Sequence, residues 1–335
     1  MLDKPFRIAV DAMGGDLGPR ATIPASIEFA NLHPSVHLRL YGDPFALAGL
    51  KLPSNISLQE SSSVISMDES PSNALRNKLD SSMALALASL AEEVPFDACV
   101  SSGNTGALMA IGRHFLGTFQ HLKRPAICKA IPTITGHSYM LDLGANATAD
   151  ASLLVNFALM GSALCEEIDE IRRPTVALLN IGIENSKGNN LIKEAHEILS
   201  QNRQLNYAGF IEGDSIYSGD VNVIVCDGFV GNVALKVSEG VAKMALSQLQ
   251  GAFHQNLYGR LLGQIARPLL RKWHKQFEPA RYNGACFLGL NGCVVKSHGA
   301  ADERSFLYAL ELARDMSAKR LIGRLTEQCA NQLIE

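Results

Sequence analysis

The fold is indicated by one stretch in which a buried strand, a polar turn and a helix follow one another: DACVSSGNTGALMAIGRHFLG, residues 97–117. Its strand is a short continuous apolar run, which is typical of strands buried on both faces of a mainly parallel sheet. The same succession recurs at residues 139–164, 175–199 and 221–246. Alternation of this kind implies right-handed crossovers, so we predict an α/β protein with three layers, α/β/α, around a mainly parallel sheet.

The sequence on either side of these units continues the pattern. The further elements predicted are strands at 6–10, 37–42 and near 56, helices at about 21–31, 74–90 and 301–316, and a hairpin of ACFLGL and VVKSHG around an Asn-Gly turn. No linker is evident, so we expect one domain over residues 1–335. Ligands of such sheets bind beyond the carboxyl ends of the strands, where the polar turns must lie.

Composition limits the kind of protein. The chain has 335 residues, 47% of them hydrophobic, and a formal net charge of -3, so no basic field suggests nucleic acid as a partner. The N-terminus lacks the pattern of a signal peptide, and no run approaches the roughly 18–20 apolar residues of a membrane-spanning helix. We therefore expect a cytoplasmic protein. Scattered cysteines without a CxxC pair predict buried free thiols: Cys99, Cys128, Cys165, Cys226, Cys286, Cys293 and Cys329.

A basic amphipathic segment occupies about residues 250–280, and Pro268 should bend or break its helix. It is expected either to lie on an anionic membrane with its apolar side down, or to dock an acidic protein. The alternative is that its apolar side chains pack in the core or across a dimer. The side chains expected to make the membrane or protein contact are Leu262, Ile265, Leu269, Arg271 and Trp273.

The turn SSGNTG lies between a strand and a helix, where unpaired amides and the helix dipole favour an anion. It predicts a phosphate cradle, although an ordinary capped turn explains the same residues equally well. The candidate ligands in this turn are Ser102, Gly103, Asn104, Thr105 and Gly106.

Two later turns carry charged groups. IENSKGNN places Lys187 and Asn189 at the start of a helix, where the lysine could neutralise an anion or simply be solvated. CDGFVGN places Asp227, Gly228 and Asn232 after a very apolar strand. An aspartate there can act as a base, orient a lysine or cap the helix, and capping is the commonest use.

Three more turns occupy comparable places. LDLGANA holds Asp142 and Asn146, VDAMGGD holds acidic residues, and KSHG offers Lys296 and His298, which we expect at the same sheet edge as the other turns. A lone histidine is more often structural. The sequence has no HExxH, no GxSxG and no Cys/His pair at ligand spacing, and VDAMGGD does not match GxGxxG. We therefore predict neither a metal nor a dinucleotide cofactor.

These segments occur in one order from near residue 10 to residue 299: VDAMGGDLGP, SSGNTGALMA, RPAICKAIPT, LDLGANA, LLNIGIENSKGN, VCDGFVGNVALKVSEG and FLGLNGCVVKSHG. Together they resemble the bacterial phosphate acyltransferase family, also called acyl-carrier-protein phosphate acyltransferases. The resemblance covers nearly the whole chain. It departs from the family at Ile183, where another acidic residue is more usual, and near Cys286, where a proline is common.

The resemblance implies a fold similar to isopropylmalate and isocitrate dehydrogenases and to phosphotransacetylase. It also implies a reaction in which acyl-[acyl carrier protein] and inorganic phosphate give acyl phosphate and free carrier protein, an early step of phospholipid synthesis. The implied partners are acyl carrier protein, a second copy in a homodimer, and a membrane glycerol-3-phosphate acyltransferase that takes the product. The protein would then associate peripherally with the inner face of the membrane.

Such a reaction needs no covalent catalysis, because phosphate is already an anion and a thiolate leaves readily. The enzyme has to position phosphate and stabilise the carbonyl oxyanion. We assign phosphate to Lys187 and the SSGNTG amides, and the oxyanion to Asn232 with Asn104 or His298. Asp227 would orient Lys187 or accept a proton from phosphate. The predicted catalytic residues are Lys187, Asp227, Asn232 and His298. The residues predicted to bind phosphate or substrate are Ser102, Gly103, Asn104, Thr105, Gly106, Asp142, Asn146, Asn189 and Gly228.

Three alternatives remain open. A phosphotransacetylase-type enzyme would use acyl-coenzyme A as the donor. A decarboxylating dehydrogenase would need a carboxylate metal site and a nicotinamide site, and the sequence indicates neither. A non-catalytic membrane scaffold would not need the polar turns.

Overall fold

The computed structural model describes residues 6–254, 258, 283–330 and 332–334. Within them the strands form one 11-stranded sheet in the order β3-β2-β1-β4-β11-β10-β5-β6-β9-β7-β8. The strands are β1 Arg7–Asp11, β2 His37–Gly42, β3 Ile56–Glu60, β4 Ala98–Ser101, β5 Ala126–Thr133, β6 Gly136–Leu141, β7 Thr175–Leu179, β8 Asn206–Ile211, β9 Val223–Val225, β10 Ala285–Leu288 and β11 Cys293–Lys296.

Helices cover both faces of this sheet, which confirms the three-layer α/β/α prediction. Ile8 and Val10 of β1 point into one apolar cluster, which α1, α6, α7, α10 and α11 cover, whereas Ala9 points into a second cluster beneath α3, α4 and α5. The helices are α1 Pro19–Leu32, α2 Pro44–Leu47, α3 Pro71–Asn77, α4 Ser82–Ala88, α5 Thr105–Leu116, α6 Ala151–Asp169, α7 Asn190–Gln201, α8 Gly228–His254, α10 Glu303–Ala318 and α11 Leu321–Cys329.

The sheet has two halves whose parallel strands run in opposite directions. We call β3, β2, β1, β4 and β11 the first half-sheet, and β6, β9, β7 and β8 the second half-sheet. They oppose one another because β10 pairs antiparallel with β11 and with β5, and β5 pairs antiparallel with β6. The expectation that all the polar turns share one sheet edge is therefore wrong.

The carboxyl ends of the two half-sheets nevertheless meet, because the halves are staggered along β5. The first part of β5 pairs with β10, and the rest pairs with β6. Across β10 the register places Lys296, the last residue of β11, level with Lys129 of β5. It also places Leu141, the last residue of β6, level with Cys128. The polar turns of both halves thus converge on the middle of β5.

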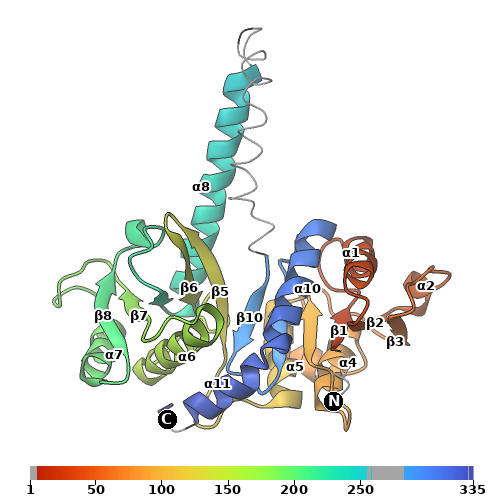
Figure 1. Ribbon diagram of the computed structural model, residues 1–335, viewed down its shortest axis with the longest axis horizontal. Helices are drawn as coiled ribbons and strands as arrows, with labels where there is room; N and C mark the ends of the chain where they lie inside the picture. Colours follow the sequence, from red (N-terminus) through yellow and green to blue (C-terminus); the bar gives the residue numbers. More distant parts are fainter. Residues whose placement is uncertain (1–5, 255–257, 259–282, 331, 335) are drawn as a thin grey trace.

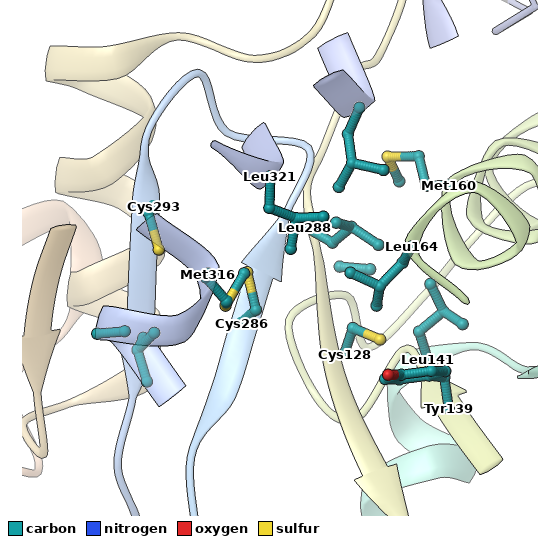
Figure 2. Packing of buried hydrophobic residues seen from close by; sticks show 14 of the residues in the cluster. Cys128, Tyr139, Leu141, Met160, Leu164, Cys286, Leu288, Cys293, Met316 and Leu321 are labelled. Carbon is teal, nitrogen blue, oxygen red and sulfur yellow. The ribbon is translucent and has the colours of Figure 1, made fainter. Parts of the chain in front are cut away.

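Apolar side chains pack next to this junction. Cys286, Cys293 and Met316 lie together beside β10 and β11, and Cys128 of β5 turns its sulfur toward Tyr139 and Leu164 (Figure 2). All seven cysteines are free and buried, as the sequence predicts. The hairpin of β10 and β11 is also confirmed.

The expected helix at 74–90 is instead broken into α3, α4 and a short 3-10 turn at Ser89–Ala91. The break has a local cause. The hydroxyl of Ser81 accepts a hydrogen bond from the amide of Ala84 at 3.3 Å and so begins a new helix. Ser81 also forms a β-bridge with Ser63, which holds it in extended backbone.

Two helices bear on membrane contact. Helix α6 is long and apolar enough to cross a membrane, but 78% of its apolar window is buried against the sheet and its neighbours, as in the core helix of a globular protein. Helix α8 rises from between the two halves of the molecule and extends away from it (Figure 1). The five predicted contact residues from Leu262 to Trp273 lie outside the described residues.

Candidate functional site

The turn after β1 is organised by a buried carboxylate. Asp11 is 1% exposed, and it accepts hydrogen bonds of 2.6 Å from the hydroxyls of both Ser82 and Ser101. Burial raises the pKa of Asp11, while these two hydroxyls oppose that shift. The residue therefore ties the end of β1 to the end of β4 and to the start of α4.

The turns after β1, β4 and β11 are locked to one another. The hydroxyl of Ser102 donates to the carbonyl oxygen of Gly14 at 2.7 Å, and the amide of Asp16 donates to the carbonyl oxygen of Gly299 at 2.8 Å. At Gly14 an added Cβ would lie 2.5 Å from Oδ2 of Asp11, so only glycine permits this approach. The first half-sheet consequently presents one rigid set of turns.

Lys296 lies in the same set, at the end of β11. Its side chain is 9% exposed, and Nζ donates to the carbonyl oxygens of Ser102, at 3.3 Å, and of Ser297. Burial lowers the pKa of Lys296 to about 8, against the opposing effect of Asp11 and Asp16. A buried lysine with a lowered pKa next to several polar turns is typical of a functional site.

His298 and α8 meet just beyond this lysine. Nζ of Lys236, on α8, lies 3.0 Å from Nε2 of His298 and 3.0 Å from Oε2 of Glu239. The backbone amide of Ala300 donates to Nδ1 of His298 at 3.1 Å. Helix α8 therefore connects the second half-sheet, where it begins, to the turns of the first.

The turn after β6 is built around Asp142, which is fully buried. Its carboxylate accepts hydrogen bonds from the amides of Ile127, Gly144, Ala145 and Asn146, and from the side-chain amide of Asn146, at 2.7–3.1 Å. Burial raises the pKa of Asp142, while these donors favour the ionised form and oppose that shift. Asp142 thus shapes the LDLGANA turn from inside, where a ligand does not reach its oxygens.

The first turn of α8 packs tightly on this LDLGANA turn. An added Cβ at Gly231 would lie 1.9 Å from the carbonyl oxygen of Asp142, which excludes any other residue there. Asn232 is exposed and flanks Gly144, since a Cβ at Gly144 would lie 3.5 Å from Cβ and Cγ of Asn232. Asn232 therefore lies against the turn that follows β6, the first strand of the second half-sheet.

The sheet and α8 contribute facing sets of polar groups. Asp11, Ser101, Lys296 and Lys129 occupy one row of the sheet and share a face with the second apolar cluster. On α8, residues 232, 236 and 239 follow at spacings of four and three and so share one side of the helix. Their side of α8 faces the row, because Lys129 interacts electrostatically with both Glu239 and Lys236.

Three predicted site residues make the contacts of helix caps. Asn104 accepts from the amide of Ala107 at 3.0 Å, and its NH2 group donates to three carbonyl oxygens of residues 66–69. Asn189 caps α7, and Asp227 accepts from the amide of Val230 at 2.9 Å at the start of α8. These contacts match the alternative reading of each residue, and their use as ligands remains a prediction.

The remaining predicted site residues lie in the loop after β7, where α8 packs on the LDLGANA turn, and in the SSGNTG turn. Lys187 is exposed in the loop after β7, where its side chain folds over Gly182, and it is not paired with Asp227 in the part of the chain that the structure describes. Gly228 packs on the backbone of Asn146, and Asn146 is 2% exposed. Within SSGNTG, Ser102, Gly103 and Asn104 are buried, and Thr105 and Gly106 are half-buried.

Sequence reasoning assigned no role to Lys129, Lys236 or Glu239. One signal was available, because Lys129 interrupts the apolar strand AICKAI, and a cation inside a buried strand needs a partner. Lys236 and Glu239 gave no such signal, since charges on a helix are usually solvated.

The thiol beside the site is not a nucleophile. Cys226 ends the run that begins with β9 and is 1% exposed. Burial, and next the carboxylate of Asp142, raises the pKa of the Cys226 thiol well above its ordinary value. Thiolate chemistry at this position is therefore disfavoured.

Comparison with known proteins agrees with this arrangement. A protein called phosphate acyltransferase from Nitrosococcus oceani is 52% identical over 312 residues, covering 91% of each chain. Another protein of that name, from Pseudomonas fluorescens, is 49% identical over 330 residues and covers 96% of this chain and 98% of its own. Among solved structures, a phosphotransacetylase from Streptococcus pyogenes has a TM-score of 0.63 at 14% identity, with 95% of each chain covered, which shows the same fold.

The family model described as fatty acid synthesis protein matches residues 6–324, nearly the whole of the sheet and its helices. That match and the high identity of the phosphate acyltransferases agree in extent and in order of the segments. The chain therefore belongs to the fatty acid synthesis protein family, together with these phosphate acyltransferases.

Proposed function

We propose that this protein transfers an acyl group from acyl-[acyl carrier protein] to inorganic phosphate. A phosphate oxygen attacks the thioester carbonyl carbon and forms the C–O bond of a tetrahedral oxyanion. The carbonyl then re-forms as the C–S bond breaks, and the carrier thiolate that leaves is protonated by the proton that the phosphate gives up. The products are acyl phosphate and free carrier protein. Phosphate acyltransferase is the name that relatives 44–52% identical to this chain carry.

The observation that carries the proposal is the junction at the middle of β5. There the cations Lys236, Lys296 and Lys129 act on His298, and Asn232 lies one helical turn before Lys236 on the same side of α8, while the neighbouring Cys226 thiol is buried and has a raised pKa. Such a site suits an anionic nucleophile and a developing oxyanion better than a covalent intermediate.

Within this reaction Asn232 is proposed to donate its amide to the carbonyl oxyanion. Its exposed position at the start of α8 supports that role, because the helix N-terminus adds a positive potential where the negative charge develops. Lys187 is proposed to attract phosphate from its loop after β7, with Asp227 nearby after β9. The two strands are neighbours and parallel, so their loops lie at the same edge.

The test compares two thioester donors at equal concentration, acyl-[acyl carrier protein] and the matching acyl-coenzyme A, with acyl phosphate measured as hydroxamate. We expect phosphate-dependent product from the carrier-protein thioester. A higher kcat/KM with acyl-coenzyme A would favour the phosphotransacetylase alternative. Absence of product from both would contradict the acyltransferase proposal and favour a scaffold.

A homodimer is part of the proposal. Helix α8 exposes a stripe on the side away from the site, and Val237 and Met244 are 59% and 60% exposed. Exposed apolar stripes of this kind are typical of helix–helix interfaces. The stripe consists of Val230, Val233, Val237, Val241 and Met244.

The double substitution Val237→Glu and Val241→Glu is expected to convert the dimer to monomer, because a second copy of α8 would bury these charges without partners. Sedimentation velocity measures the change. Lys243→Glu, a charge change outside the stripe on the same helix, is the control and should leave the mass unchanged. A dimer that survives the double substitution at micromolar concentration would contradict pairing through α8.

Membrane association belongs to the same proposal. It is supported by the sequence of the basic amphipathic segment and by α8, which projects away from the sheet (Figure 1). We propose a cytoplasmic protein that touches an anionic membrane through this segment and delivers acyl phosphate to a membrane acyltransferase. Unaltered cosedimentation of the Leu262→Glu, Leu269→Glu variant with anionic vesicles would argue against direct contact.

A further inference from the structure

His298 is in contact with two hydrogen-bond donors. Nδ1 lies 3.1 Å from the backbone amide of Ala300, and Nε2 lies 3.0 Å from Nζ of Lys236. A neutral imidazole carries one N–H and one bare nitrogen, so it accepts only one hydrogen bond. Partial burial, and then Lys236, lowers the pKa of His298, which keeps the ring neutral near pH 7. In one of the two contacts, two hydrogen-bond donors must therefore face each other.

The conflict falls on Nε2. The backbone amide of Ala300 has a fixed proton and donates to Nδ1, so the proton of the ring must be on Nε2. This N–H then faces the ammonium group of Lys236. Glu239 accepts one proton of Lys236 at 3.0 Å, and the contact between the ammonium group and the imidazole remains unfavourable. A hydrogen-bond acceptor that accepts from both the Lys236 ammonium and the Nε2–H of His298 removes this unfavourable contact.

The charges around the ring define the acceptor. Three lysines, Lys236, Lys296 and Lys129, and one carboxylate, Glu239, act electrostatically on His298. Burial, and then Lys236, also lowers the pKa of Lys129, while Glu239 opposes that shift. An excess of partly buried positive charge, with an N–H aimed among the cations, favours an oxyanion with several acceptor atoms.

We propose that Lys236, Lys129 and the Nε2–H of His298 bind the attacking inorganic phosphate, an inference that rests on the proposed acyl transfer. Lys236 lies one helical turn after Asn232 on the same side of α8, so the phosphate sits beside the group assigned to the oxyanion. The SSGNTG turn then serves chiefly to hold Lys296, through the carbonyl oxygen of Ser102.

The test measures phosphate binding without turnover. In protein labelled with ¹⁵N-histidine, inorganic phosphate should shift the ring signals of His298 in a saturable way, and calorimetry gives the dissociation constant. Lys236→Gln and Lys129→Met are each expected to raise that constant about tenfold or more, the effect of losing one charge-assisted hydrogen bond. The control Lys243→Gln, on the exposed outer part of α8, should change it by less than about twofold.

The Lys129→Arg variant should recover most of the affinity, which a purely structural role of this position would not predict. Ring signals that ignore phosphate, or wild-type affinity in both Lys236→Gln and Lys129→Met, would overturn the inference. Different results would contradict the proposed acyl transfer and the proposed phosphate site. Phosphate bound at His298 by an enzyme that forms no acyl phosphate contradicts the acyltransferase reaction alone, whereas normal turnover with an unchanged KM for phosphate in Lys236→Gln contradicts this site alone.

Discussion

An Asn232→Ala enzyme is expected to show a kcat lowered by about 10²–10³-fold, the usual effect of removing one oxyanion donor. The side chain is exposed and packs beside Gly144, so its loss should leave the fold intact. Steady-state kinetics with the carrier-protein thioester measures the change. Gln248→Ala removes an exposed amide farther along α8 and is the matched control. A kcat within threefold of wild type would remove Asn232 from the chemistry.

The companion variant Lys187→Ala separates binding from chemistry. Because Lys187 is assigned to phosphate, its loss should raise the KM for phosphate by about tenfold or more and lower kcat less than the loss of Asn232 does. Its exposed position on the loop after β7 makes a folding defect improbable. Normal phosphate dependence in Lys187→Ala would show that the assignment is wrong and would leave the anion to the cations around His298.

Asp142→Ala is expected to lower the free energy of unfolding by about 3–5 kcal/mol, since it strands several buried donors at once. Five N–H groups converge on this carboxylate, among them both the backbone and side-chain amides of Asn146. Urea unfolding followed by circular dichroism measures the loss.

The control for this prediction is Asp150→Ala at the start of α6. Asp150 is exposed and accepts from the amide of Leu153 at 2.8 Å, so its loss should cost about 1 kcal/mol, as for a helix cap. Equal destabilisation by the two substitutions would mean that Asp142 is no more than a cap. A variant Asp142→Asn should fall between them, since it keeps one oxygen acceptor and turns the other position into a donor.

Much of the fold could be predicted from local sequence. The continuous apolar strands, the polar turns and the hairpin of β10 and β11 all have short-range signals, and the structure confirms them. The direction of the strands could not be predicted in the same way. It depends on β10 and β11 entering the sheet between β4 and β5, which come from a distant part of the chain. No periodicity within one segment encodes such a pairing.

The candidate site shows the same division between features that have a local sequence signal and features that depend on long-range contacts. The turns that carry Asn232, Asp142 and His298 could be found because glycine and asparagine after an apolar run mark the end of a buried strand. The partners of those residues could not be found. Lys236 meets His298 only because α8 crosses from one half-sheet to the other, and Lys129 becomes central only through the stagger along β5.

The place of the hairpin in the sheet has a consequence for synthesis on the ribosome. Strands β4 and β5 are made early, yet the residues that pair between them, 285–296, emerge only in the last fifth of the chain. Until then both strands present unpaired backbone edges, which are prone to aggregate. A protein truncated before residue 285 should therefore be insoluble even though most of its helices are complete.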